Sequence, residues 1–231
     1  MAEKAATQSQ ETRGKSLCWN CQSEIHSVFF CVNCVKVQPI SHESDYFSIF
    51  GLPRKLKLHP AALEAKYHEL SRKLHPDFYQ GKTETEKVYS LDNSAVVNAA
   101  YRTLKDPFLR MEYLVKLEEG ASKEIEKKAP QDLLSEMLEF QENLVEYQSS
   151  RDGAETERLR HSLAESLSLL RSRLSQDAER AESLFEKWDA LVTSGAGRPE
   201  EKKALLSQMK EILSNRAYLE RVVNGISEEI E

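Results

Sequence analysis

Residues Leu63–Tyr79 read LEAKYHELSRKLHPDFY, and the rest of the chain is organised around them. Apolar side chains recur in this stretch at the spacing of one helix face, namely Leu63, Tyr67, Leu70 and Leu74. The opposite face is mostly basic and carries Lys66, Arg72 and Lys73. Proline lacks a backbone N–H and disfavours helical angles in the residue before it, so we expect the helix to end near His75. The pattern predicts an amphipathic helix and then a loop that presents His75, Pro76 and Asp77.

The flanking segments supply partners for this helix. Upstream, Asp45–Leu52 reads DYFSIFGL, which is typical of a short apolar helix closed by a glycine. Downstream, Ala100–Pro107 reads AYRTLKDP and ends a second long helix. Two antiparallel helices whose apolar stripes face each other can close a small core, and the loop between them would project the His-Pro-Asp tripeptide. This order of features resembles the J-domain of DnaJ-type co-chaperones, here at residues 45–117.

All four cysteines of the chain lie near the N-terminus, in two Cys-x-x-Cys pairs separated by residues 22–30; they are Cys18, Cys21, Cys31 and Cys34. Two such turns can place four sulfurs around one metal ion, so the spacing predicts a structural Zn²⁺ site. Iron in the same four thiolates and a pair of disulfides are the alternatives. The neighbouring Ser27–Phe30 and Val35–Val37 read as strands, so we expect a zinc-ribbon-like unit at 17–40 whose fold depends on the metal. His26 is expected to be a bystander.

The C-terminal half is dominated by three helical patterns, at about Gln131–Gln148, Glu155–Val192 and Glu200–Ile230. The first includes Leu134, Met137, Leu138, Leu144 and Val145. Short connections make antiparallel neighbours, so residues 131–231 are expected to form a three-helix bundle. The charged segment 118–130 is expected to be a linker, and the polar residues 1–16 are expected to be disordered. The predicted fold class is therefore mainly α.

A cysteine unit, a J-like segment and a C-terminal helical bundle together resemble the HscB family, the J-type co-chaperones of iron–sulfur cluster biogenesis. The resemblance extends from about Cys18 to the C-terminus and includes LLSEMLEF at Leu133–Phe140. It implies that the His-Pro-Asp loop and the basic helix face dock on a heat-shock ATPase of the DnaK/HscA type and stimulate it. It also implies that the bundle binds the iron–sulfur scaffold IscU. The matching positions are Leu134, Leu138, Glu139, Glu142 and Tyr218, with Leu133 as the substitute if the register shifts by one.

Composition limits the other functions. The net charge of −6 and the pI of about 5.7 disfavour general nucleic-acid binding. No apolar run is long enough to span a membrane, and Met1–Lys15 lacks the apolar core of a secretion signal. We therefore expect a cytoplasmic protein, with the mitochondrial matrix as the alternative if a transit peptide has been removed.

The sequence contains no pairing of a nucleophile with a base and no phosphate-binding glycine loop, so it predicts no enzyme. The rival hypothesis is a general J-domain co-chaperone that binds clients or partners through its zinc-dependent cysteine unit. A helical, glycine-poor C-terminal half disfavours that rival. The cysteine unit is also a candidate surface for a homodimer.

Overall fold

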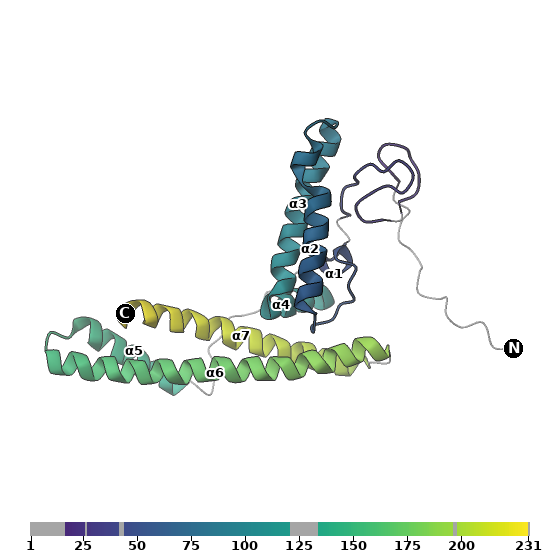
Figure 1. Cartoon of the computed structure of the whole chain (residues 1–231). Coiled ribbons are helices and arrows are strands. Elements are labelled where there is room, and N and C mark those ends of the chain that lie inside the picture. The colour runs from purple at the N-terminus through teal and green to yellow at the C-terminus, as the bar shows by residue number, and fades with distance from the viewer. Residues whose placement is uncertain (1–16, 26, 42–43, 121–133, 196–197, 231) are drawn as a thin grey trace. The chain divides into compact units, whose positions relative to one another are not determined.

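The computed structural model describes residues 17–25, 27–41, 44–120, 134–195 and 198–230 (Figure 1). The expected disordered segment 1–16 lies outside the described residues, as does most of the expected linker. The described chain falls into two compact units, one with residues up to Pro53 and His59–Leu104, the other with Arg54–Leu58 and the chain from Lys105 onward. Within the described part, no helix is long and apolar enough to cross a membrane. The domain boundaries expected from the sequence remain predictions.

The first unit contains the helix that ends at the His-Pro-Asp turn. Helix α1 (Tyr46–Ile49) is capped by the carboxylate of Asp45, which accepts from the backbone N–H of Ser48 at 2.9 Å. Helix α2 (Pro60–Leu74) has proline at its first position and ends at Leu74, two residues before Pro76 and close to the predicted end near His75. A single 3-10 turn, η1 (Pro76–Tyr79), and helix α3 (Glu84–Lys105) follow.

The two long helices of this unit pack as an antiparallel pair, with η1 at one end (Figure 1). The apolar side chains that they bury include Leu63, Leu70, Leu74, Val97, Ala100 and Leu104. Tyr67 and Tyr101 stack beside it, with ring centroids 4.1 Å apart. The carbonyl oxygen of Leu74 accepts hydrogen bonds from the hydroxyls of Ser90 (2.7 Å) and Ser94 (2.8 Å). These bonds satisfy a carbonyl at the end of α2, so α3 fixes the point where the turn begins.

The second unit is mainly a helical bundle. Helix α4 (Pro107–Glu119) is followed by the antiparallel helices α5 (Leu134–Ser149), α6 (Gly153–Ser194) and α7 (Pro199–Ile230). Gly195 ends α6 at φ +62°, a left-handed conformation that favours glycine. A buried cluster joins the three long helices and contains Met137, Phe140, Leu163, Leu167, Leu170, Leu219 and Val223. The predicted mainly α fold with a three-helix bundle is therefore confirmed.

Hydrogen bonds and an ion pair attach the short loop Arg54–Leu58 to α6 of the bundle. The carboxylate of Asp189 on α6 accepts from the backbone N–H groups of Leu56 and Lys57. The indole Nε1 of Trp188 donates to the carbonyl oxygen of Arg54 at 2.9 Å. Lys57 also pairs with Glu186 at 2.8 Å. These contacts join residues far apart in the chain, and the sequence pattern did not predict them.

Candidate functional site

The four cysteine sulfurs lie within 4.8 Å of one another. The Sγ atoms of Cys18 and Cys34 are 3.6 Å apart, and those of Cys21 and Cys31 are 3.7 Å apart. Four sulfurs bound at about 2.3 Å around Zn²⁺ would be separated by about 3.8 Å. All four residues are free cysteines. The sulfurs therefore form a candidate metal site with the size of a tetrahedral thiolate centre.

Two similar turns place these sulfurs, the first cysteine turn at residues 18–23 and the second at 31–36. In each, the first cysteine exchanges backbone hydrogen bonds with the residues four and five positions later. The residue after the second cysteine is left-handed in both turns, with φ +60° at Gln22 and +59° at Val35. A left-handed backbone is costly for any residue with a Cβ and unusual for a β-branched one. The repeated geometry points both turns toward one centre.

The strands expected around these turns are much shorter in the described residues. Phe30 and Val37 form one isolated antiparallel bridge, and Leu17 and Glu24 form another. Most backbone hydrogen bonds of the segment are used to close the turns, which leaves few for a ladder.

Polar groups near the sulfurs change their acidity. A hydrogen bond with the Ser23 hydroxyl, at 3.0 Å, lowers the pKa of Cys21 to about 6. A backbone hydrogen bond at Lys36 lowers the pKa of Cys34, but burial and the neighbouring thiols Cys21 and Cys18 outweigh it and raise this pKa to about 11. Four thiolates this close repel one another unless a cation is shared among them. The donor set therefore fits a thiophilic cation.

The cysteine segment is attached to α3. The indole of Trp19 donates to the carbonyl oxygen of Val37 at 2.7 Å and meets Tyr89 edge-on. The buried Asn93 side chain donates to the carbonyl oxygen of Gln38 (2.8 Å) and accepts from the N–H of Ile40 (3.1 Å). Sequence reasoning missed this interface, although a polar Asn93 among the core positions of α3 was a possible signal.

The His-Pro-Asp turn is exposed, and the buried Tyr79 anchors the backbone that follows it. The side chains of His75 and Asp77 are 51% and 70% exposed, and their Nδ1 and Oδ2 atoms are 3.5 Å apart. The N–H of Asp77 donates to His75 Nδ1 at 3.3 Å. Tyr79 is buried at the end of the turn, and its hydroxyl donates to the carbonyl oxygen of Lys73 at 3.1 Å. The turn therefore presents an imidazole and a carboxylate on a short, anchored backbone.

The basic face belongs to α2, the helix that directly precedes this turn in the chain. Lys66 and Lys73 both pair with Glu69, at 3.0 and 2.7 Å, and Arg72 is exposed nearby on the helix. The hydrogen bonds from Lys73 and Lys66 lower the pKa of Glu69 to about 2. Because Glu69 carries a full negative charge at neutral pH, the face is less basic than the lysines alone suggest.

The leucines expected to bind a scaffold lie on the surface of α5. Leu134 is 48% exposed and Leu138 is 62% exposed, and Val145 extends this apolar stripe at 64%. Glu139 and Glu142 are exposed on the same helix. Tyr218 lies on α7, half-buried against the core cluster. The alternative Leu133 lies outside the described residues. Val145 has the spacing of the stripe, but its exposure could not be inferred from spacing alone.

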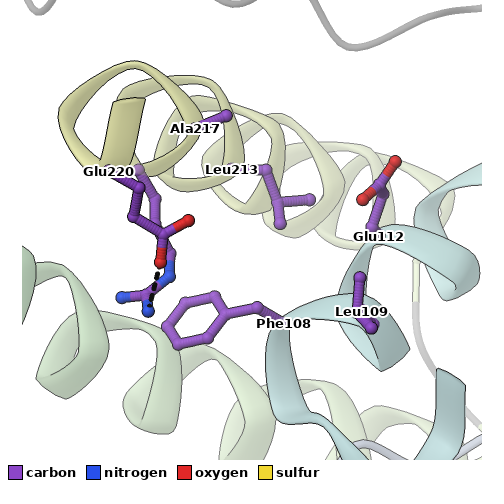
Figure 2. Close-up of a pocket in the computed structure, with 7 residues that line it drawn as sticks. Phe108, Leu109, Glu112, Leu213, Ala217 and Glu220 are labelled. Atoms are coloured by element: carbon purple, nitrogen blue, oxygen red, sulfur yellow. Dashed lines mark ion pairs between the residues drawn. The ribbon is translucent and has the colours of Figure 1, made fainter. Parts of the chain in front are cut away.

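A groove between α4 and α7 has a volume of about 130 Å³ (Figure 2). The guanidinium of Arg216 stacks on the Phe108 ring at 3.9 Å and pairs with Glu220 at 2.7 Å. Ligand pockets usually measure about 300–1,000 Å³, so this groove has the size for a side chain rather than a cofactor.

Comparisons with known proteins agree on one family. No family model matches the chain. It is 38% identical over 133 residues to the iron–sulfur cluster co-chaperone protein HscB homolog of Arabidopsis thaliana, a match over 58% of this chain and about half (52%) of that protein. It is 35% identical over 214 residues to the iron–sulfur cluster co-chaperone protein HscB of Mus musculus, covering 87% of this chain and 82% of the relative. The crystal structure of human co-chaperone protein HscB matches with a TM-score of 0.66 and 26% identity, covering 93% of this chain and 98% of that one.

Proposed function

The chain belongs to the HscB family of iron–sulfur cluster co-chaperones, and from this premise we propose that it links two partners. Its C-terminal bundle binds an IscU-type scaffold, and its His-Pro-Asp turn stimulates the ATPase of a DnaK/HscA-type chaperone. The observation that most supports the proposal is the exposed turn, His75 to Asp77, anchored at the end of a partly basic helix.

The chaperone-binding surface consists of the turn and the basic residues of α2, which are His75, Pro76, Asp77, Lys66, Arg72 and Lys73. Basic side chains attract an acidic partner surface and mainly raise the rate of encounter. His75 and Asp77 then offer oriented hydrogen-bonding groups to the bound ATPase. Such a turn acts by binding one conformational state of the chaperone more tightly than another, because only differential affinity shifts an equilibrium.

The scaffold-binding surface is the apolar stripe of α5. Leu134 and Leu138 are one helical turn apart and exposed, whereas Met137 and Phe140 of the same helix are buried. An apolar centre with a charged rim is the usual anatomy of a protein interface, and Glu139 and Glu142 supply that rim. Val145 continues the stripe. We assign Tyr218 a supporting role, since it packs against the core beneath α5.

We propose Zn²⁺ as the ion held by the tetracysteine centre, with iron as the alternative. The separations of 3.6 and 3.7 Å support a single tetrahedral ion. When bound, the metal would supply the folding free energy of a segment too short to bury a core of its own. Elemental analysis of the protein as purified distinguishes zinc from iron, and thiol titration after metal removal excludes disulfides if four thiols react.

We propose that the chain has no catalytic activity of its own. Leu17, Val32 and Val35 are 53%, 66% and 75% exposed on the cysteine unit, which supports this unit as a candidate homodimer surface. Light scattering would test for the dimer.

We propose the cytoplasm as the compartment of the protein, with the mitochondrial matrix as the alternative. Imaging of the full chain with a C-terminal fluorescent tag separates these compartments.

The deciding experiment is chaperone ATPase turnover with the purified protein, with and without IscU. We expect stimulation that IscU enhances and that His75→Gln removes. Leu134→Ala combined with Leu138→Ala should remove only the enhancement by IscU, whereas Leu169→Ala, at an exposed leucine of α6, should leave both unchanged. Stimulation that is indifferent to IscU would favour a general J-domain co-chaperone. No stimulation of any heat-shock ATPase would overturn the co-chaperone proposal.

A further inference from the structure

Lys36 links the cysteine centre to α3. It closes the second cysteine turn, where its carbonyl oxygen accepts from the N–H of Cys31 at 2.9 Å. Its Nζ atom lies 2.9 Å from Oε1 of Glu86, in the first turn of α3. The side chain of Glu86 is only 5% exposed, whereas that of Lys36 is 33% exposed. A carboxylate this buried needs its partners, because an unpaired buried charge is costly.

The second oxygen of Glu86 holds the residue that precedes α3. Its Oε2 atom accepts from the backbone N–H of Thr83 at 3.2 Å and from the Thr83 hydroxyl at 2.9 Å. The Thr83 hydroxyl in turn accepts from the N–H of Glu86 at 3.3 Å. This reciprocal pair is a capping box, which satisfies the free N–H groups at the start of a helix. One carboxylate therefore both binds the cysteine unit and caps α3.

The segment between the cap and the His-Pro-Asp turn is short. Tyr79 ends η1, and the N–H of Lys82 donates to its carbonyl oxygen at 3.0 Å. Tyr79 is itself buried, and burial together with the negative charge of Glu86 raises its pKa. Residues 76–83 are thus anchored at Tyr79 and Thr83, and Glu86 binds the second of these anchors directly.

We propose that the Lys36–Glu86 pair couples metal binding at the four cysteines to the order of residues 76–83, which follow His75 and include the rest of the His-Pro-Asp turn. In the metal-bound protein, the second cysteine turn holds Lys36 where it fixes Glu86 in its capping position. When the metal is lost, the turn no longer fixes Lys36, and a flexible lysine holds a carboxylate only weakly. The cap then loosens, and the exposed turn loses its fixed geometry. Lys36 and Glu86 are positioning residues in this scheme. Any effect of the coupling on chaperone stimulation rests on the proposed function.

Hydrogen exchange of the full chain tests the coupling without any chaperone. Removing the metal with a chelator should speed exchange at residues 76–83 by about tenfold, the scale of one lost helix cap. Lys36→Met should produce the same increase while the metal content stays at the wild-type level. Lys36→Arg should restore protection, because it keeps the charge and the reach. Lys87→Met is the matched control, since Lys87 pairs with Glu84 at 2.7 Å in the same turn of α3 without touching the cysteine unit.

Two results would overturn the proposal. The first is unchanged exchange at residues 76–83 after metal removal or in metal-loaded Lys36→Met. The second is an increase of the same size in Lys87→Met. A parallel ATPase assay separates this proposal from the broader one. If His75→Gln abolishes stimulation but Lys36→Met exchanges like the wild type, the co-chaperone function stands and the coupling fails. If exchange responds as expected but no chaperone is stimulated, the coupling stands and the proposed function fails.

Discussion

Asp189 on α6 accepts a hydrogen bond from the backbone N–H of Leu56 at 2.7 Å, although 133 residues separate them in the chain. The other oxygen of the same carboxylate accepts from the N–H of Lys57 at 2.9 Å. Leu56 itself is fully buried. One side chain therefore satisfies two consecutive backbone donors and attaches a loop to the bundle.

We expect Asp189→Ala to lower the free energy of unfolding by about 2–4 kcal/mol, because two N–H groups lose a charged acceptor. Glu182→Ala is the control, since Glu182 also faces Lys57 but at 3.8 Å and with 60% exposure. It should cost less than about 0.5 kcal/mol. Urea unfolding measures both, and equal effects of the two substitutions would contradict the assigned role of Asp189.

Val35→Gly should stabilise the metal-bound protein by about 0.5–1 kcal/mol, because glycine relieves the left-handed backbone at φ +59°. The side chain of Val35 is 75% exposed, so little packing is lost. Val32→Gly is the matched control, because Val32 is similarly exposed at 66% but its φ is not positive. It should destabilise the protein, since glycine only adds freedom to the unfolded chain. Thermal unfolding of the zinc-loaded variants gives the comparison, and a lower melting temperature for Val35→Gly would refute it.

The buried carboxyl of Asp177 should make the bundle less stable as the pH rises. Burial raises the pKa of Asp177, although Arg180 lies 3.2 Å from its Oδ1 atom and opposes the shift. Its Oδ2 atom is buried without a hydrogen-bond partner among the described residues. The pKa is higher in the folded state than in the unfolded state, so ionisation costs stability as the pH rises above the unfolded value of about 3.9.

Asp177→Asn removes this ionisation. The free energy of unfolding of this variant should therefore exceed that of the wild type by about 1 kcal/mol at pH 7. The difference should vanish near pH 3. Urea unfolding at several pH values, followed by the fluorescence of Trp188 in the same unit, measures the curve. A variant that is less stable than the wild type at pH 7 would show that the pairing with Arg180 outweighs burial.

Ser23→Ala should weaken zinc binding about tenfold at pH 7, the scale expected when a group that supports a metal ligand is lost. The Ser23 hydroxyl lowers the pKa of Cys21 to about 6, so Cys21 is mostly thiolate at pH 7. Without the Ser23 hydroxyl, the pKa of Cys21 rises, so the metal must displace a proton from this thiol in order to bind. Affinity should fall more steeply with decreasing pH, and more protons should be released.

Zinc titration calorimetry in two buffers with different ionisation enthalpies measures that proton release. Ser23→Thr keeps the hydroxyl and should behave like the wild type. Equal proton release from the wild type and Ser23→Ala would show that the hydroxyl does not set the acidity of the site.

Local chemistry explains which features the sequence predicted. The end of α2 at Leu74 follows from Pro76, and the cysteine cluster follows from two short turns, so each depends on a few neighbouring residues. The contacts of Asp189 and Lys36 were missed because each depends on a partner far along the chain. Both residues look like ordinary charged positions in the sequence.

The apolar stripe of α5 illustrates another limit. Leu134 and Leu138 share a helical pattern with the buried Met137, because apolar residues occupy two faces of the same helix. Periodicity identifies the helix but does not say which face the other helices cover. The core cluster settles this, since α6 and α7 pack on the side of Met137 and Phe140.

The length of α6 gives the bundle a property of its own. The helix has 42 residues, and α5 packs against it around Leu167 while the 54–58 loop is fixed at Asp189. At 1.5 Å per residue these two places are roughly 30 Å apart along one helix axis. The helix therefore holds the α5 stripe at a fixed distance from residues 54–58. Lengthening α6 and α7 together between these two places would therefore change that spacing within the bundle.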